Sequence, residues 1–93
     1  GEFEDEHDKK RLIARQTGEN EYEFAGRVEI EQINEQFHLG IPENEHYHTL
    51  AGYILETRGE LPRVNDTFTI GDLSFTVLRM SATKIKLLRV RRV

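Results

Sequence analysis

The order of apolar and polar residues predicts strands at both ends of the chain and two helices between them. Residues 12–16 and 21–25 flank the turn-rich tetrapeptide Thr17-Gly18-Glu19-Asn20, a pattern that is typical of a β-hairpin. Tyr22 and Phe24 alternate with glutamates in the second of these segments, so one face of that strand is apolar and the other polar.

A short amphipathic helix is predicted next, because apolar residues recur at approximately helical spacing while Glu and Gln occupy the positions between them. The apolar positions are Val28, Ile30, Ile33 and Phe37. Acidic residues in the first turn favour the positive end of the helix dipole. Gly40 and Pro42 are expected to end this helix.

A second helix is predicted to begin near His48 or Thr49, with Thr49 as its N-cap. Its apolar stripe consists of Leu50, Tyr53, Ile54 and Thr57. Gly52 lies inside the helix, where glycine costs on the order of 1 kcal/mol relative to alanine. The glycine therefore indicates close approach of another backbone, from the sheet or the first helix. Gly59 ends the helix, and Pro62 prevents it from resuming.

The last third of the chain predicts three strands. Residues 67–70 alternate, Gly71-Asp72 fits a two-residue hairpin loop, and residues 73–80 form the returning strand. Residues 81–83 turn the chain into a long final strand at residues 84–93.

The apolar pattern of the final strand changes phase within it. Ile85 and Leu87 share one face, whereas Leu88 and Val90 share the other. Because a strand cannot change phase by one residue without exchanging its faces, the pattern predicts a β-bulge at Leu87-Leu88.

These elements predict an α+β fold, a mostly antiparallel sheet with two helices packed on one face, in the order ββααβββ. Ninety-three residues suffice for one domain. We expect residues 1–9 to form an acidic linker arm and residues 10–93 to form the domain. The start at Gly1, leading directly into an acidic run, indicates a piece of a longer protein. No run approaches the roughly 20 apolar residues of a membrane-spanning helix, so we expect no direct membrane insertion of this piece.

The net charge of −4 conceals an asymmetry between the two parts of the chain. Residues 1–60 contain 15 acids and 6 Lys or Arg, whereas residues 61–93 contain 2 acids and 7 Lys or Arg. The basic residues gather in the final strand, as Lys84, Lys86, Arg89, Arg91 and Arg92. Such a cluster fits either a solvated edge strand or a footprint for nucleic acid or anionic lipid, and the edge strand is favoured. Nucleic acid is not an expected partner, because all aromatic residues precede this strand and offer it no stacking platform.

The sequence contains no recognisable catalytic centre. There is no cysteine, which excludes disulfides, thiolate zinc sites and a cysteine nucleophile. Ser74 and Ser81 are the only serines, and neither lies in a Gly-x-Ser-x-Gly elbow. The glycines are isolated, so no dinucleotide-binding or phosphate-binding loop is present. We therefore expect that the chain is not an enzyme and has no catalytic residues.

Two acidic clusters contain residue types that bind metal ions. His46 and His48 lie beside Glu43 and Glu45, but histidines two apart share a face only on a strand, and no HExxH motif is present. Surface or capping histidines are therefore favoured. The N-terminal acids lack the glycine and bidentate glutamate of an EF-hand loop, which favours an acidic linker. These acids are Glu2, Glu4, Asp5, Glu6 and Asp8. No metal site is predicted.

Several segments, taken in order, resemble the CorC/HlyC or transporter-associated domain over essentially the whole chain. They are the acidic arm at residues 1–8, Tyr22 with Phe24-Ala25-Gly26, Ile30-x-x-Ile33-Asn34, Leu39-Gly40-Ile41-Pro42-Glu43, Thr49 to Leu55 continuing through Gly59 to Leu61-Pro62, Phe68-x-Ile70, and Phe75-x-Val77 leading into the basic strand. One departure is Asn65-Asp66, where the family often has glycine before the acid. Asparagine tolerates left-handed backbone comparatively well, so the turn is expected to survive.

The resemblance implies the C-terminal module of a larger bacterial membrane protein, in which it follows a membrane domain and a pair of CBS domains. Such proteins are labelled hemolysins or magnesium and cobalt efflux proteins. We therefore expect a non-catalytic accessory domain at the cytoplasmic face of the inner membrane. Its expected partners are the CBS pair, the membrane domain or a second copy in a homodimer.

Flavin binding is an alternative that the same resemblance implies, because the fold is grouped with certain FAD-binding domains. The chain would then be a sensor that binds FAD or an adenine nucleotide, although no cofactor is required by the first interpretation. Arg58, Arg63 and Arg79 could serve an anionic ligand. No cofactor-binding residue of the family can be assigned by position, so these residues remain unknown. Contact of the basic strand with anionic lipid is a third, weaker hypothesis.

Overall fold

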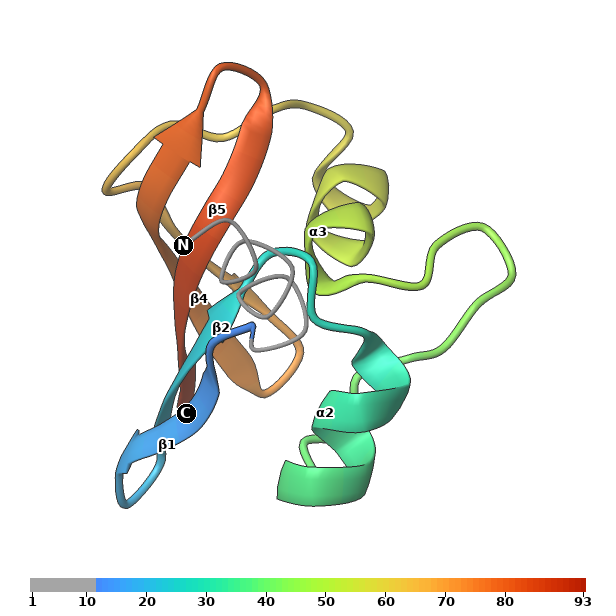
Figure 1. Cartoon of the computed structure of the whole chain (residues 1–93), viewed down its shortest axis with the longest axis vertical. Helices are drawn as coiled ribbons and strands as arrows, with labels where there is room; N and C mark the ends of the chain where they lie inside the picture. Colours follow the sequence, from blue (N-terminus) through green and yellow to red (C-terminus); the bar gives the residue numbers. More distant parts are fainter. Residues whose placement is uncertain (1–11) are drawn as a thin grey trace, which may run out of the picture.

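The computed structural model describes residues 12–93, and the predicted arm at residues 1–9 lies outside the described residues. The observed order is ββααβββ, as the sequence predicts, with both helices on one side of the sheet (Figure 1). The elements are β1 (Ala14–Gly18), β2 (Glu21–Ala25), α2 (Ile30–Phe37), α3 (Leu50–Arg58), β3 (Thr67–Ile70), β4 (Leu73–Ser81) and β5 (Lys84–Arg92). The first hairpin turns at Glu19 and Asn20, since β1 continues to Gly18.

The five strands form one sheet in the order β1-β2-β5-β4-β3, and every neighbouring pair is antiparallel. The last strand therefore lies at the centre of the sheet, between β2 and β4. The prediction that the basic strand is an edge strand is wrong. Its cations tolerate a central position because Ile85, Leu88 and Val90 fill the core face of β5, which leaves Arg89 and Arg91 on the solvent face.

The core lies between the sheet and the two helices. Phe37 of α2 packs edge-on against Tyr22 and Phe24 of β2, with ring centroids 5.5 and 5.3 Å apart. Tyr53 of α3 covers Phe75 of β4, with centroids 6.2 Å apart. All of these aromatics except the half-buried Phe37 are buried. The apolar stripes predicted from the sequence thus form one shared core.

The two helices start side by side because the segments before them pair. The Ile30 amide donates to the His48 carbonyl at 2.9 Å, and the Leu50 amide donates to the Val28 carbonyl at 2.9 Å. Val28 is buried but precedes the helix, although the periodicity included it. At the other end, His38 adopts a left-handed conformation with φ 57° and ends α2 before Gly40 is reached.

The second helix has the predicted caps but a shorter apolar stripe. The Thr49 hydroxyl accepts from the Gly52 amide at 3.1 Å, and Gly59 ends the helix with φ 78°. Leu50, Tyr53 and Ile54 are buried, whereas Thr57 is exposed.

The explanation predicted for Gly52 is wrong, since neither the sheet nor α2 approaches it. A Cβ there would lie 3.1 Å from Tyr47 Cβ and 3.3 Å from Thr49 Oγ1. Both atoms belong to the loop that folds back over the first turn of α3, so the constraint on Gly52 is local.

We expect Thr49→Ala to lower the free energy of unfolding by about 1 kcal/mol, because the first turn of α3 loses its side-chain cap. Thr57→Ala is the matched control, since Thr57 is exposed in the last turn of the same helix and should change stability by less than about 0.5 kcal/mol. Urea denaturation followed by circular dichroism measures both variants. Equal effects would show that the hydrogen bond to Gly52 does not stabilise the helix.

A bulge in β5 is confirmed, but its extra residue is Lys86, next to the predicted Leu87-Leu88 step. Val77 pairs with Leu88 and Arg79 with Leu87, and Met80 then pairs with Ile85. Leu78 is therefore an extra residue on β4, and Lys86 is an extra residue on β5. Two irregularities that compensate each other keep Ile85 and Leu88 in the core and leave Leu87 on the opposite face.

The turn at Asn65-Asp66 also forms as predicted, although asparagine stands where glycine is expected. Asn65 has φ 76°, a left-handed conformation in which asparagine costs less than most residues. Its amide donates to the Val77 carbonyl at 2.7 Å, and the Val77 amide donates to the Asp66 carbonyl at 2.9 Å. The turn therefore ties the segment after α3 to β4.

Candidate functional site

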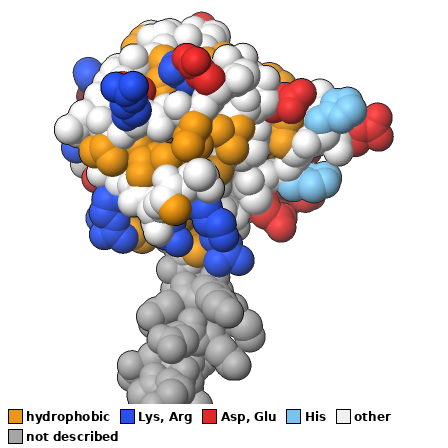
Figure 2. Space-filling model, turned by 90° about the horizontal axis from the view of Figure 1, so that it is seen from above, with side chains coloured by type: hydrophobic (Ala, Val, Ile, Leu, Met, Phe, Trp, Pro, Cys, Tyr) orange, Lys and Arg blue, Asp and Glu red, His pale blue; other side chains and the backbone are white. Residues whose placement is uncertain are grey.

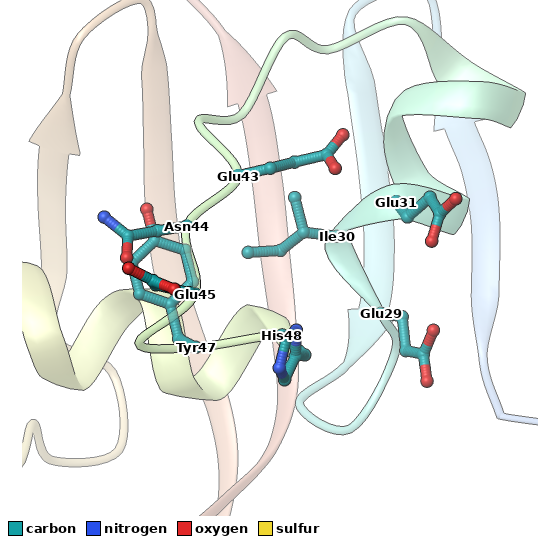
Figure 3. A pocket seen from close by; sticks show the side chains of 8 residues that line it. All are labelled: Glu29, Ile30, Glu31, Glu43, Asn44, Glu45, Tyr47 and His48. Atoms are coloured by element: carbon teal, nitrogen blue, oxygen red, sulfur yellow. The ribbon is translucent and has the colours of Figure 1, made fainter.

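An open groove of about 320 Å³ lies where the start of α2 meets the loop that leads into α3 (Figure 3). Pairing of residues 28–30 with residues 48–50 brings these two segments together. The groove is lined by Glu29, Ile30, Glu31, Glu43, Asn44, Glu45, Tyr47 and His48. Four of the eight side chains are carboxylates, so we call it the acidic groove.

Side-chain hydrogen bonds hold the loop that forms one wall of the acidic groove. The Asn34 side chain donates to the Ile41 carbonyl at 2.8 Å and accepts from the Ile41 amide at 2.9 Å. The Asn34 side-chain nitrogen Nδ2 also donates to Glu43 Oε2 at 3.3 Å, and the Tyr47 hydroxyl donates to the Pro42 carbonyl at 3.0 Å. The loop is therefore fixed on α2.

The carboxylates of the acidic groove do not converge on a common point. Glu29 and Glu31 point away from the loop, and Glu45 points to the opposite side (Figure 3). Within residues 12–93, no three His, Asp or Glu side chains are arranged to hold a metal ion. Of the cluster considered from the sequence, Glu43, Glu45 and His48 line the groove and His46 does not.

The groove adjoins a pair of tyrosines, of which Tyr53 is buried and Tyr47 is half-buried. The Tyr47 and Tyr53 rings meet edge-on with centroids 5.4 Å apart, and Tyr53 is buried against Phe75. Burial, and secondarily the neighbouring Tyr47 phenol, raises the pKa of the Tyr53 phenol above its usual value of about 10.

This shift predicts a loss of stability in alkaline solution. A raised folded-state pKa means that the folded protein binds the phenol proton more tightly than the unfolded chain does. The contribution of this proton to the free energy of unfolding is therefore complete below about pH 10, and it is lost as pH rises through the folded-state pKa. We expect Tyr53→Phe to flatten the fall in unfolding free energy above pH 10, in urea denaturation between pH 8 and 11. Tyr22→Phe is the control. Identical slopes in the wild type and Tyr53→Phe would contradict the assignment.

The sheet face opposite the helices, which we call the outer face, carries paired charges. Glu23 lies 2.8 Å from Arg15, and Glu21 lies 3.5 Å from Arg89 and 3.9 Å from Arg91. Beyond them the Thr67 and Thr76 hydroxyls share a hydrogen bond at 3.0 Å. Exposed ion pairs of this kind add less than about 1 kcal/mol each, so they set the charge pattern more than the stability.

The five basic residues of β5 do not form a single stripe. Arg89 and Arg91 face Glu21 on the outer face, whereas the Arg92 guanidinium donates to the His38 carbonyl at 3.3 Å. The two remaining cations, Lys84 and Lys86, lie towards the β4–β5 turn. The footprint considered from the sequence is thus divided among three places.

Apolar side chains interrupt the outer face beside the bulge. Leu78 and Leu87 are half-buried without packing against the core cluster, and Ala25 pairs with Leu87. Ile13 completes the group, because its carbonyl accepts from the Ala25 amide at 2.7 Å and its side chain is 36% exposed. We call these four residues the outer patch. Periodicity alone could not reveal it, since the bulge decides which way Leu87 points.

Viewed from the β4–β5 turn, apolar side chains form a band bordered by Lys and Arg (Figure 2). Histidines and several acids gather at the other side, where the loop of the acidic groove projects (Figure 2). The apolar band is thus bordered by cations, whereas the side of the acidic groove carries acids and histidines.

The remaining candidates are separated in the structure. Ser74 lies within β4 and Ser81 at its exposed end. Arg58 places its guanidinium 4.2 Å from the centre of the Phe68 ring and 3.6 Å from Glu60, so this cation is already engaged. Arg63 belongs to the loop after α3 and Arg79 to β4, opposite Leu87. Among residues 12–93, no helix combines the length and the apolar character needed to span a bilayer.

Comparison with known proteins gives a consistent set of relatives. The magnesium and cobalt efflux protein CorC of Pasteurella multocida is 28% identical over 91 residues, which cover 97% of this chain and 30% of that protein. The chain spans less than a third of the length of the relatives that it matches in this way.

Two solved domain structures share the fold. A hemolysin domain from Enterococcus faecalis is 29% identical, with a TM-score of 0.74, and the match covers 86% of this chain and 96% of that one. The transporter-associated domain of a CBS domain protein from Porphyromonas gingivalis is 28% identical, with a TM-score of 0.69 and coverage of 87% and 98%. The family model of the transporter-associated domain, CorC_HlyC, matches residues 15–93. The chain therefore belongs to the CorC/HlyC family of transporter-associated domains.

Proposed function

We propose that this chain is a non-catalytic accessory domain of a divalent-cation efflux or hemolysin-like membrane protein, and that it acts by contacting a neighbouring domain. Family membership over residues 15–93 and the likeness to a magnesium and cobalt efflux protein support this proposal. The solved relative from a CBS domain protein supports the CBS pair as the neighbour. The domain would then lie at the cytoplasmic face of the inner membrane.

The observation that carries the proposal is the form of the acidic groove. It is open and carries four carboxylates, and none of these takes part in the ion pairs found within residues 12–93. Their side chains diverge, which suits contact with a broad cationic surface better than chemistry on one bound atom (Figure 3). Complementary charge of this kind gives an interface its specificity and accelerates association.

Within residues 12–93 the core itself offers little for catalysis. Every buried side chain there is apolar or aromatic, and no polar or charged residue is buried. The buried group with a shifted pKa is the Tyr53 phenol, and its ring packs against Tyr47 and Phe75 as part of the core. We therefore assign the buried residues to the scaffold and the acidic groove to partner binding.

Titration of the chain with the CBS pair of its parent protein tests this function. We expect a saturable complex by calorimetry, and about tenfold weaker binding for Glu31→Lys, which reverses a charge at the groove. Glu35→Lys is the matched control, since Glu35 is exposed on the same helix and does not line the groove. Absence of binding, or equal effects of both reversals, would contradict the proposal. Light scattering of the chain alone would reveal a homodimer.

Nucleotide binding is the alternative implied by the family resemblance, and no observation on residues 12–93 favours it over contact. The three arginines proposed for an anionic ligand come from three different segments, and Arg58 is already stacked on Phe68. Calorimetry with FAD, ATP and AMP distinguishes the two functions. Saturable heat with any of these ligands would favour the sensor.

A further inference from the structure

We propose that the acidic arm at residues 2–8 of this chain binds the outer patch, and so fixes the direction in which the chain enters the domain. The surface is the group Ile13, Ala25, Leu78 and Leu87, and the occupant is a segment of the same molecule. This inference concerns the chain alone and a surface other than the acidic groove, so it does not rest on the proposed function.

The outer patch is an apolar site on a face that is otherwise polar. Leu78 and Leu87 lie opposite each other across the bulge and neither belongs to the core. The rest of the face consists of the threonines of β3 and β4 and the charge pairs of β2 and β5. A partner that covers the leucines must therefore offer at least one apolar side chain.

Cations border the outer patch without acidic partners in the described part of the chain. Arg79 pairs with Leu87 across the two strands, and Lys84 and Lys86 follow towards the β4–β5 turn. All three side chains are exposed, and none takes part in the ion pairs within residues 12–93. Arg89 and Arg91 differ in this respect, because Glu21 faces both. Within residues 12–93, no acidic partner therefore compensates the positive charge at this end of the face.

The arm combines an aromatic side chain with carboxylates, which complement the leucines and the cations of this surface. Phe3 stands between Glu2 and Glu4, and three further acids follow by residue 8. One aromatic side chain can cover the leucines while the flanking carboxylates meet Arg79, Lys84 and Lys86. The exposed Leu55 of α3 offers less, since Glu56 is its chain neighbour.

The sheet register places the start of β1 at the end of the outer face where Leu87 lies. Ala14 pairs with Phe24, which pairs with Leu88, so β1 and β5 run in the same direction. Leu12 and Ile13, which precede Ala14, therefore lie towards the level of Leu87, Lys86 and the β4–β5 turn. β1 and β5 lie about 10 Å apart, with β2 between them. Leu12 and Phe3 are nine positions apart in the chain and can be separated by up to about 30 Å, so the reach is sufficient.

Paramagnetic relaxation enhancement on the full chain tests this contact. The chain contains no cysteine, so Gly1→Cys accepts a single nitroxide label. We expect the label to reduce the amide signals of Leu78, Lys86 and Leu87 at least about twofold, and to spare those of α3 on the other side of the sheet. Phe3→Ser should abolish this difference without affecting folding of residues 12–93. Leu87→Ser should do the same, whereas Leu61→Ser, at a leucine that is 41% exposed on a loop, should not.

Several results would overturn the proposal. Equal signal loss on both faces, or a pattern unchanged by Phe3→Ser, would show that the arm does not bind the outer patch. An arm that pairs only with the adjacent Lys9, Lys10 and Arg11 would give a pattern insensitive to Leu87→Ser. Signal loss in a mixture of spin-labelled and isotope-labelled chains would instead mean that the arm binds a second copy.

Discussion

Replacing Gly26 with alanine is expected to lower the free energy of unfolding by about 3 kcal/mol or more, the largest effect that we predict for a single methyl group. A Cβ at this position would overlap the Ile85 carbonyl oxygen and would lie 3.3 Å from Ala51 Cβ. The Gly26 amide donates to the Lys86 carbonyl at 3.1 Å, and its carbonyl accepts from the Ala51 amide at 2.9 Å. The glycine thus joins the end of β2 to the central strand and to α3, and none of the three can move aside alone.

Gly18→Ala is the matched control for this prediction. A Cβ at Gly18 would meet only Glu21 Cβ, at an ordinary 3.5 Å. Chemical denaturation followed by circular dichroism should find this variant within about 1 kcal/mol of the wild type. Domains of this size have about 5–15 kcal/mol of stability in total, so the difference between the two variants is easily measured. Equal stabilities would mean that the β2, β5 and α3 backbones do not meet at Gly26.

Leu88→Ala is expected to cost about 3 kcal/mol, whereas Leu87→Ala should cost about 1 kcal/mol or less. The two leucines are neighbours on the central strand, but Leu88 is fully buried in the core and Leu87 is half-buried on the outer face. The bulge at Lys86 causes this difference, because it reverses the alternation between Ile85 and Leu88. The same denaturation experiment compares the pair. Without the bulge Leu87 would join Ile85 in the core, and the order of the two costs would be reversed.

Local features of the fold can be predicted from the sequence where a residue type is favoured for one specific structural role. Thr49 and Gly59 bound α3 as predicted, because a side-chain acceptor and a left-handed glycine suit those positions specifically. The bulge was readable because the phase of the apolar residues cannot otherwise change between Leu87 and Leu88. These features depend on neighbours in the chain.

The order of the strands could not be read in the same way. The cations of β5 suit an edge strand and the solvent face of a central strand equally, so composition did not distinguish the two. The decision comes from pairing of β5 with β2, which lies more than 60 residues earlier in the chain. Gly52 shows the opposite error, because a distant contact was predicted and the loop of Tyr47 supplies a local one.

The candidate site was predicted only in part. Glu43, Glu45 and His48 were identified by their proximity in sequence, and they line the acidic groove. Glu29 and Glu31 were assigned only to a helix turn, since their position beside the loop depends on the pairing of residues 28–30 with residues 48–50. That pairing has no distinctive sequence signal, as backbone groups alone form it.

Hydrogen exchange of the chain, alone and in the presence of the CBS pair of its parent protein, tests most directly whether this domain acts through the acidic groove. The account predicts slower amide exchange at residues 29–31 and 43–48 in the complex, with β1 unchanged. Exchange that is identical with and without the CBS pair, or protection confined to elements away from the groove, would contradict it.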